Sequence, residues 1–209
     1  NLPQGVKHSA ANLRERVLSP LQEALAARLP FTLTEGQQRA IADISRDMAG
    51  PHPMARLLQG DVGSGKTLVS FMAALRAIEM GGQAALLAPT ELLARQHAEN
   101  AAKLLEPLGL SVAFLTGNIK AAGRNALLTA LKTGQIHLVI GTHALFSSDV
   151  GYHKLRLVII DEQHRFGVLQ RSAILAKGDN PDLLMMSATP IPRTLALTVF
   201  GDLDVSVIS

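Results

Sequence analysis

The sequence predicts an α/β fold, a doubly wound and mostly parallel sheet with helices on both faces. Short apolar runs of strand length recur along the chain, at residues 55–58, 84–88, 111–115, 136–140, 157–160, 183–186 and 203–208. Helical patterns lie between them, at roughly residues 35–49, 67–80, 90–105, 121–132, 168–177 and 191–199. Several of these patterns stop at a glycine, as helix C-caps favour: Gly81, Gly134, Gly178 and Gly201.

The segment before the first strand has a different pattern. Apolar residues recur every fourth position and suggest one helical face, which Pro20 breaks or restarts: Leu13, Val17, Leu21, Leu25 and Leu29. The alternation of strands and helices begins near residue 31. We therefore expect an N-terminal linker or helix over residues 1–30 and one α/β domain over residues 31–209.

Composition excludes several classes of protein. With 209 residues, of which 47% are hydrophobic, the chain is long enough for one good-sized core. Its apolar runs are shorter than the ~18 residues that a membrane span needs. The absence of cysteine excludes disulfides, thiolate metal sites and cysteine nucleophiles. The first residues, NLPQGVKHSA, lack the pattern of a secretory signal, so we expect a cytoplasmic protein.

The strand at 55–58 is followed by a phosphate-binding pattern. The stretch GDVGSGKT matches G-x-x-x-x-G-K-[ST], for which a chain of this composition gives roughly 0.005 chance matches. Its glycines let backbone N–H groups point at phosphate oxygens, and the helix that begins near Gly65 adds its positive dipole end. Lys66 would reach the β- and γ-phosphates and Thr67 would ligate Mg²⁺. The predicted nucleotide-binding residues are Gly60, Asp61, Val62, Gly63, Ser64, Gly65, Lys66 and Thr67.

The strand at 157–160 ends in a cluster of polar residues, within LRLVIIDEQHRFG. Asp161 suits a metal-holding acid opposite Thr67, and Glu162 suits the base that accepts a proton from the attacking water. The adjacent acids favour an NTPase over a switch GTPase, which uses a glutamine, and the guanine-reading pattern N-K-x-D is absent. Gln163 and His164 either form a solvated turn or report the state of the γ-phosphate to other parts of a machine.

Charge and aromatic content limit how the protein could contact nucleic acid. The net charge of +3 is compatible with a nucleic-acid partner but does not require one. Aromatic residues make up 3% of the chain and tryptophan is absent, which disfavours a single-strand binder that stacks bases on aromatic side chains. Contacts with nucleic acid are therefore expected to be made mainly with phosphates.

Together these motifs resemble those of superfamily 2 helicases. The matching stretches, which occur in the expected order, are GDVGSGKT, APTELLARQH (88–97), GTHALF (141–146), DEQH and SATPIPRTLAL (187–197). The combination of DEQHRFGV with TPIPRT is similar to the RecG family of bacterial branched-DNA helicases, over about residues 29–208. The resemblance implies the first RecA-like domain of a helicase core, a P-loop domain that uses ATP and Mg²⁺ and acts on branched or forked DNA.

The resemblance also implies roles for single residues. Gln37, in LTEGQ, resembles the glutamine that reads the adenine edge. Residues that would couple hydrolysis to movement of a second domain are Gln163, His164, Ser187 and Thr189. Residues that would contact the DNA backbone are Thr90, Arg95, Thr116, Gly117, Thr142 and His143. Arg193 either joins them or caps its own helix.

Partners and alternative functions follow from the same comparison. The family implies a second RecA-like domain, which supplies an arginine finger, and a wedge domain that grips branched DNA; without them the chain alone is expected to be nearly inactive. A transcription–repair coupling translocase is the nearest alternative, although such proteins typically read DEEH where this chain has Gln163. A P-loop small-molecule kinase and a non-catalytic nucleotide sensor are further alternatives. The adjacent acids and the SAT segment disfavour the kinase, and the complete set of Lys66, Asp161 and Glu162 disfavours the sensor.

Overall fold

The computed structural model describes residues 18–161, 168–188 and 203–208. They form a seven-stranded sheet in the order β3-β4-β2-β5-β6-β1-β7, in which the strands pair in parallel throughout. The strands are β1 (Ala55–Gly60), β2 (Gln83–Leu87), β3 (Val112–Leu115), β4 (Leu138–Gly141), β5 (Leu155–Asp161), β6 (Asp182–Ser187) and β7 (Asp204–Ile208). The predicted doubly wound α/β fold is confirmed.

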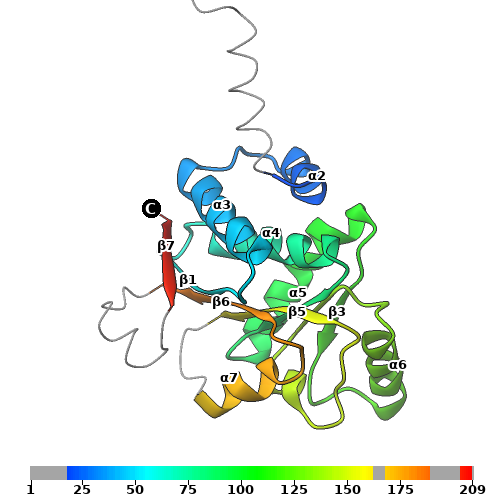
Figure 1. The fold of residues 1–209 in the computed structure, drawn as a ribbon. Helices are drawn as coiled ribbons and strands as arrows, with labels where there is room; N and C mark the ends of the chain where they lie inside the picture. Colours follow the sequence, from blue (N-terminus) through cyan, green and yellow to red (C-terminus); the bar gives the residue numbers. More distant parts are fainter. Residues whose placement is uncertain (1–17, 162–167, 189–202, 209) are drawn as a thin grey trace, which may run out of the picture.

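Helices cover both faces of the sheet (Figure 1). One layer holds α2 (Pro20–Arg28), α3 (Glu35–Ala49), α4 (Lys66–Glu79) and α5 (Glu91–Leu105). The other holds α6 (Ala121–Lys132), α7 (Val168–Leu175) and the 3₁₀ turn η2 (His143–Phe146), while η1 (Glu106–Leu108) extends α5. Within the described residues, each helix is too short or too polar to cross a bilayer. The helix predicted over residues 191–199 lies outside the described residues.

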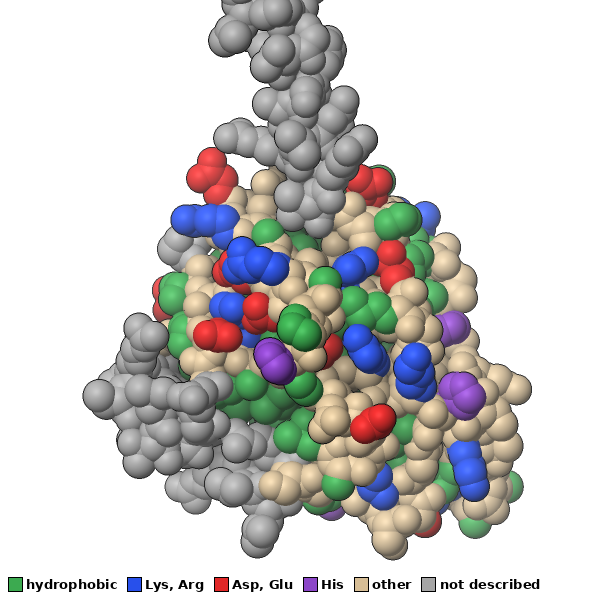
Figure 2. All heavy atoms as spheres, in the orientation of Figure 1, with side chains coloured by type: hydrophobic (Ala, Val, Ile, Leu, Met, Phe, Trp, Pro, Cys, Tyr) green, Lys and Arg blue, Asp and Glu red, His purple; other side chains and the backbone are tan. Residues whose placement is uncertain are grey.

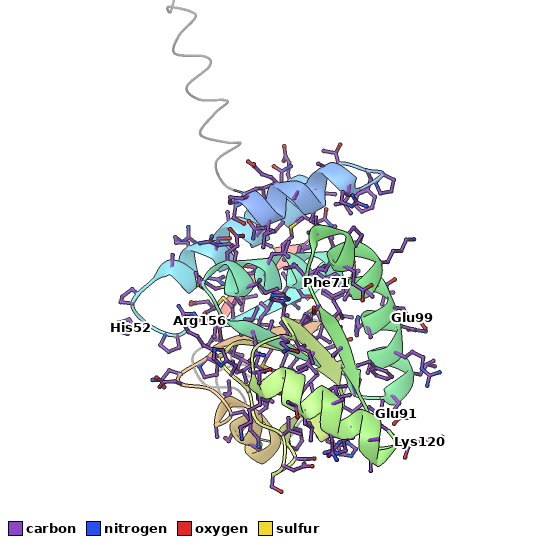
Figure 3. The ribbon with its side chains drawn as sticks, turned by 90° about the vertical axis from the view of Figure 1, so that its right-hand side faces the viewer. His52, Phe71, Glu91, Glu99, Lys120 and Arg156 are labelled. Carbon is purple, nitrogen blue, oxygen red and sulfur yellow. The ribbon has the colours of Figure 1, made fainter. Side chains whose placement is uncertain are left out.

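The interior strands are apolar on both sides because each side packs against a helical layer, whereas the edge strand β7 exposes Val205 and Val207. Leu58, Leu86 and Ile159 belong to the core beneath α3, α4 and α5, where Phe71 of α4 also lies (Figure 3). Neighbouring positions on the same strands, such as Leu57 and Ile160, face the second core, beneath α6, α7 and η2. This double burial explains why the strands appear in the sequence as continuous apolar runs.

The N-terminal helix α2 packs against α4. Pro20 occupies the first position of the helix, after a capping box between Ser19 and Gln22. Leu25 is fully buried, and Gln22 Nε2 donates to the Met72 carbonyl oxygen of α4 at 2.9 Å. Leu13 and Val17 lie outside the described residues, and the domain boundary at residue 31 stays a prediction.

Strand β1 leads into the stretch GDVGSGKT, residues 60–67, which we call the P-loop. The start of this strand is held by hydrogen bonds on both sides. The buried guanidinium of Arg56 donates to Asp47 of α3 at 2.7 Å and to Ser206 of β7 at 2.9 Å. The backbone N–H of Met54 donates to the buried carboxylate of Asp182, which opens β6, at 2.6 Å. Burial raises the pKa of the Asp182 carboxyl, partly opposed by this hydrogen bond. These contacts fix β1 relative to α3, β6 and β7.

Candidate functional site

The carboxyl ends of the parallel strands meet along one edge of the sheet, where ligands bind in open α/β folds. The strand order divides this edge into two halves. Predicted nucleotide-site residues follow or end β1, β5 and β6, which are neighbours. Predicted DNA contacts follow β2, β3 and β4, which are neighbours in the other half. The sequence predicts that these residues lie at strand ends. The strand order then places the predicted nucleotide-site residues in one half of the edge and the predicted DNA contacts in the other.

The P-loop is a tight backbone turn between β1 and α4. Gly63 and Gly65 have φ angles of 85° and 87°, in the left-handed region that favours glycine. A Cβ added at Gly65 would lie 2.0 Å from Gln37 Nε2, and one added at Gly60 would lie 2.5 Å from Ser64 Oγ. The loop therefore needs glycine for its conformation and for the close approach of its neighbours. It delivers the chain directly into the N-terminus of α4, a 14-residue helix.

Gln37 lies beside this loop, although α3 precedes it by a whole strand. Its side-chain Oε1 accepts from the Thr34 N–H at 2.9 Å, and its own N–H donates to Thr34 Oγ1 at 3.1 Å. This capping box fixes the side chain, which is 5% exposed, so that Nε2 faces Gly65. The structure thus brings the predicted adenine-reading residue to the phosphate loop.

Lys66 folds back over the loop that it follows. Its Nζ donates to the Gly60 carbonyl oxygen at 2.5 Å and to the Asp61 carbonyl oxygen at 3.1 Å. Partial burial lowers the pKa of the ammonium, and the nearby charges of Asp161 and Asp61 oppose that shift. The electrostatic interaction of Lys66 with Asp161 indicates that the ends of β1 and β5 share one site. A phosphate anion bound there would complement the same ammonium.

Asp161 ends β5 two strands away from the P-loop, about 10 Å at the usual strand spacing. Ser187, at the end of β6, lies between them: it is buried, it pairs with Gln59 of β1, and Met186 before it pairs with Asp161. Thr67 follows Lys66 in the first turn of α4. The predicted metal-binding and coupling residues Asp161 and Ser187 are thereby held on rigid strand ends next to the loop.

One residue at this site was missed by sequence reasoning. The His97 Nε2 lies 2.6 Å from Oδ2 of Asp161, and the two side chains are only 11% and 14% exposed. His97 belongs to α5, on the buried stripe that also carries Ala94, Ala101 and Leu105. A histidine on an otherwise apolar stripe was the available signal, but the sequence could not identify its partner.

The other half of the edge offers a mixture of exposed and buried groups. Arg95, Gly117 and His143 are exposed. Thr90 is also exposed, and its hydroxyl caps α5 by accepting from the Leu93 N–H at 3.2 Å. Thr116 and Thr142 are only 9% and 6% exposed, so these two residues are less accessible to a ligand than their exposed neighbours Gly117 and His143.

The remaining predicted site residues lie outside the described residues: Glu162, Gln163, His164, Thr189 and Arg193. Their roles stay predictions. On the face drawn in Figure 2, lysine and arginine side chains alternate with acidic ones and do not form a single basic patch. Phosphate contacts on this face would therefore depend on individual groups.

Comparison with known protein families gives a match over most of the chain. The family described as DEAD/DEAH box helicase matches residues 34–198. The chain belongs to the DEAD/DEAH box helicase family.

This chain is similar to proteins named ATP-dependent DNA helicase RecG. That of Treponema pallidum (strain Nichols) is 65% identical over 198 residues, which cover 91% of this chain and 29% of that protein. That of Bacillus subtilis (strain 168) is 50% identical over 202 residues, covering 97% of this chain and 30% of that protein. The chain thus spans less than a third of these relatives, and the predicted resemblance to RecG helicases is confirmed.

Solved structures of helicases share the fold. A structure of RecG bound to a three-way DNA junction superimposes with a TM-score of 0.80 at 42% identity, covering 96% of this chain and 28% of that one. The DUF1998 helicase MrfA bound to DNA gives a TM-score of 0.69 at 20% identity, covering 92% and 29% of the two chains. At that identity the second likeness concerns the fold alone.

Proposed function

We propose that this chain is the first RecA-like domain of an ATP-dependent DNA helicase, the motor half that remodels branched DNA such as junctions and stalled forks in recombination and repair. The observation that carries the proposal is the divided sheet edge, with phosphate-binding chemistry on one half and candidate DNA contacts on the other. Similarity to RecG proteins at 65% and 50% identity supports the choice of DNA helicase. So does the similar structure of RecG on a three-way DNA junction.

Nucleotide binding would use the backbone more than side chains. The N–H groups between Gly63 and Thr67 would donate to phosphate oxygens, aided by the N-terminal dipole of α4. The ammonium of Lys66 would exchange its carbonyl acceptors for the β- and γ-phosphates. Gln37 would read the adenine edge by its amide, from a position fixed by the capping box with Thr34.

The residues present fit a magnesium ion. Thr67 offers a hydroxyl and Asp161 a carboxylate, and Mg²⁺ prefers such hard oxygen ligands. The carboxylate ends a buried strand, and its charge acts on Lys66. Bound Mg²⁺ would neutralise charge on the phosphates that Thr67 and Lys66 approach. Glu162 would accept the proton of the attacking water.

DNA would be held at the ends of β2, β3 and β4. Arg95 and His143 offer exposed polar side chains, and Thr90 and Gly117 offer accessible loop positions. The segments of Thr116 and Thr142 would contribute through backbone N–H groups. Such contacts position the phosphate backbone without reading sequence. Residues 163, 164, 187 and 189 would transmit the nucleotide state, and Arg193 would join the DNA contacts.

The complete motor would include other parts of a longer protein. The chain corresponds to 29% of the length of the Treponema pallidum relative. A second RecA-like domain would close the nucleotide cleft and supply an arginine, and a wedge domain would grip the branch point. The cytoplasm, where such DNA lies in bacteria, is the proposed location.

The test is DNA-dependent ATP hydrolysis and fork unwinding by the full-length protein. We expect forked DNA to stimulate hydrolysis and the protein to separate the fork, and expect the Lys66→Ala variant to do neither. A rate of ATP hydrolysis that is unchanged by DNA would contradict the proposal. DNA-stimulated hydrolysis with translocation on duplex but without unwinding would favour a coupling translocase. Phosphate transfer to a small molecule would favour a kinase.

A further inference from the structure

Helix α5 carries a buried polar side chain into the metal-binding part of the site. Along α5, the core-facing positions are occupied by alanine and leucine except at His97. Its ring nitrogen Nε2 lies 2.6 Å from Oδ2 of Asp161. Because an ionised carboxylate only accepts hydrogen bonds, the Nε2–H of the imidazole donates.

This hydrogen bond constrains the acid that the proposed function assigns to Mg²⁺. A carboxylate at a strand end can rotate about its last side-chain bond, and a short bond to one oxygen fixes that rotation. Oδ2 is engaged by His97, which leaves Oδ1 as the oxygen for a metal. Both side chains are largely shielded from solvent, at 11% and 14% exposure, so water competes little for the bond.

The contact also joins the two halves of the sheet edge. Asp161 ends β5, in the nucleotide half, and α5 follows β2, in the half that carries the candidate DNA contacts. Thr90 caps the first turn of α5. Arg95 and His97 are two positions apart, so their side chains leave the helix in roughly opposite directions. Arg95 lines a groove against β3, whereas His97 meets Asp161.

We propose that His97 is a positioning residue of the metal site: it holds Oδ2 of Asp161 so that Oδ1 is presented to Mg²⁺, and it ties that orientation to helix α5. The inference rests on the proposed function, because it needs Asp161 to bind the nucleotide's metal. A histidine with a purely structural role would only provide a hydrogen bond to the buried carboxylate of Asp161. The two roles differ in whether metal affinity depends on the donor at position 97.

The experiment measures nucleotide and metal binding by the full-length protein, with a fluorescent ATP analogue in Mg²⁺ and in EDTA. We expect His97→Ala to raise the half-saturating Mg²⁺ concentration about 10-fold, as loss of an outer hydrogen-bond partner of a metal ligand does elsewhere. Affinity in EDTA should stay at the wild-type value. His97→Gln should recover most of the metal affinity, because its amide can donate from nearly the same place.

A matched control is His137→Ala. His137 Nδ1 accepts from the Ser111 N–H at 2.9 Å, so this variant also loses a histidine hydrogen bond, but away from Asp161. It should keep wild-type Mg²⁺ dependence. Thermal unfolding of each variant separates a change in the metal site from loss of the fold.

Two results would overturn the inference while the proposed function stands. One is an unchanged half-saturating Mg²⁺ concentration in His97→Ala. The other is an equal loss of affinity in Mg²⁺ and in EDTA with a lowered melting temperature and no recovery in His97→Gln, which would make His97 a structural residue. If the wild-type protein bound nucleotide without any Mg²⁺ dependence, the metal role of Asp161 and this inference would both fail.

Discussion

At the scale of single residues, the tightest constraint in the proposed nucleotide site is at Gly65. Its φ is 87°, and the Gln37 amide nitrogen lies 2.0 Å from the place that a Cβ would occupy, so a side chain at this position would have to displace the Gln37 amide. We expect Gly65→Ala to weaken ATP binding at least about 10-fold, since left-handed backbone alone costs a non-glycine residue roughly 1–2 kcal/mol. Equilibrium binding of a fluorescent ATP analogue measures this.

Gly81→Ala is the matched control for that change. Gly81 has a φ of 83°, so alanine there meets the same backbone strain, but no atom lies within 4 Å of the added Cβ. It lies just beyond the C-terminal end of α4, away from the P-loop. We expect Gly81→Ala to lower the melting temperature and to leave ATP affinity unchanged. Equal ATP affinity in Gly65→Ala and wild type would refute the close-approach argument.

Lys66 and Glu162 are expected to fail in different ways. Lys66→Ala removes the cation that would bind the phosphates, so ATP affinity and turnover should fall together. Glu162→Gln keeps the shape and removes only the base, so ATP binding should persist while kcat falls at least about 100-fold. Binding and single-turnover hydrolysis by the full-length variants separate the two. Normal hydrolysis by Glu162→Gln would remove that residue from the mechanism.

At this scale, the sequence predicts sites whose residues are close together in the chain. The P-loop was predictable because its glycines, lysine and threonine all lie within eight consecutive residues, 60–67. The pairing of His97 with Asp161 was not, since it joins α5 to β5 across the fold and neither residue's neighbours indicate it. Gln37 required a family resemblance, because its place beside Gly65 is set by the packing of α3.

At the scale of elements, the sequence predicted the strands and helices that the structure describes, but it did not predict the order of the strands across the sheet. Strands buried on both faces leave apolar runs in the sequence, and each parallel connection requires a helix between them. The sequence does not indicate on which edge of the growing sheet each successive strand is added. The order β3-β4-β2-β5-β6-β1-β7 depends on which helix packs on which face, a property of the assembled core. The division of the edge between candidate ligands was therefore visible only in the structure.

The buried acid at the start of β6 gives a prediction about stability and pH. Burial raises the folded-state pKa of Asp182, so its contribution to stability is full below the unfolded pKa of about 3.9 and is lost as the pH rises through the folded value. Asn at this position still accepts from the Met54 N–H and has no charge to desolvate. We expect Asp182→Asn to gain stability relative to wild type between pH 4 and pH 7.

Denaturant unfolding of the wild type and variant across this pH range measures the difference. Asp179→Asn serves as the control, because Asp179 lies near the surface in the loop before β6. It gives the reference for the loss of one exposed carboxylate. A difference for Asp182→Asn that shrank as the pH rose would mean that Arg156 stabilises the native carboxylate by more than burial destabilises it.

At the scale of the whole molecule, the nucleotide site is expected to need a second wall. The P-loop, Asp161 and Ser187 lie along a single sheet edge, and in the proposed function this edge would supply one wall of a cleft. In the proposed function the other wall belongs to a second RecA-like domain. An arginine from such a partner contributes about 10³–10⁵ in rate in other P-loop enzymes. The contribution of each wall to ATP hydrolysis can be measured by comparing the isolated domain with the full-length protein.

We expect residues 1–209 alone to bind ATP weakly, to hydrolyse it at least about 10³-fold more slowly than the full-length protein, and to unwind nothing. Affinity for DNA should be low and should fall steeply with salt, because one domain makes few phosphate contacts. ATP hydrolysis by both proteins, with and without forked DNA, provides the comparison, and circular dichroism verifies that the shorter chain is folded. Robust DNA-stimulated turnover by residues 1–209 would mean that the active site is complete within one domain, and the two-wall mechanism would then be wrong.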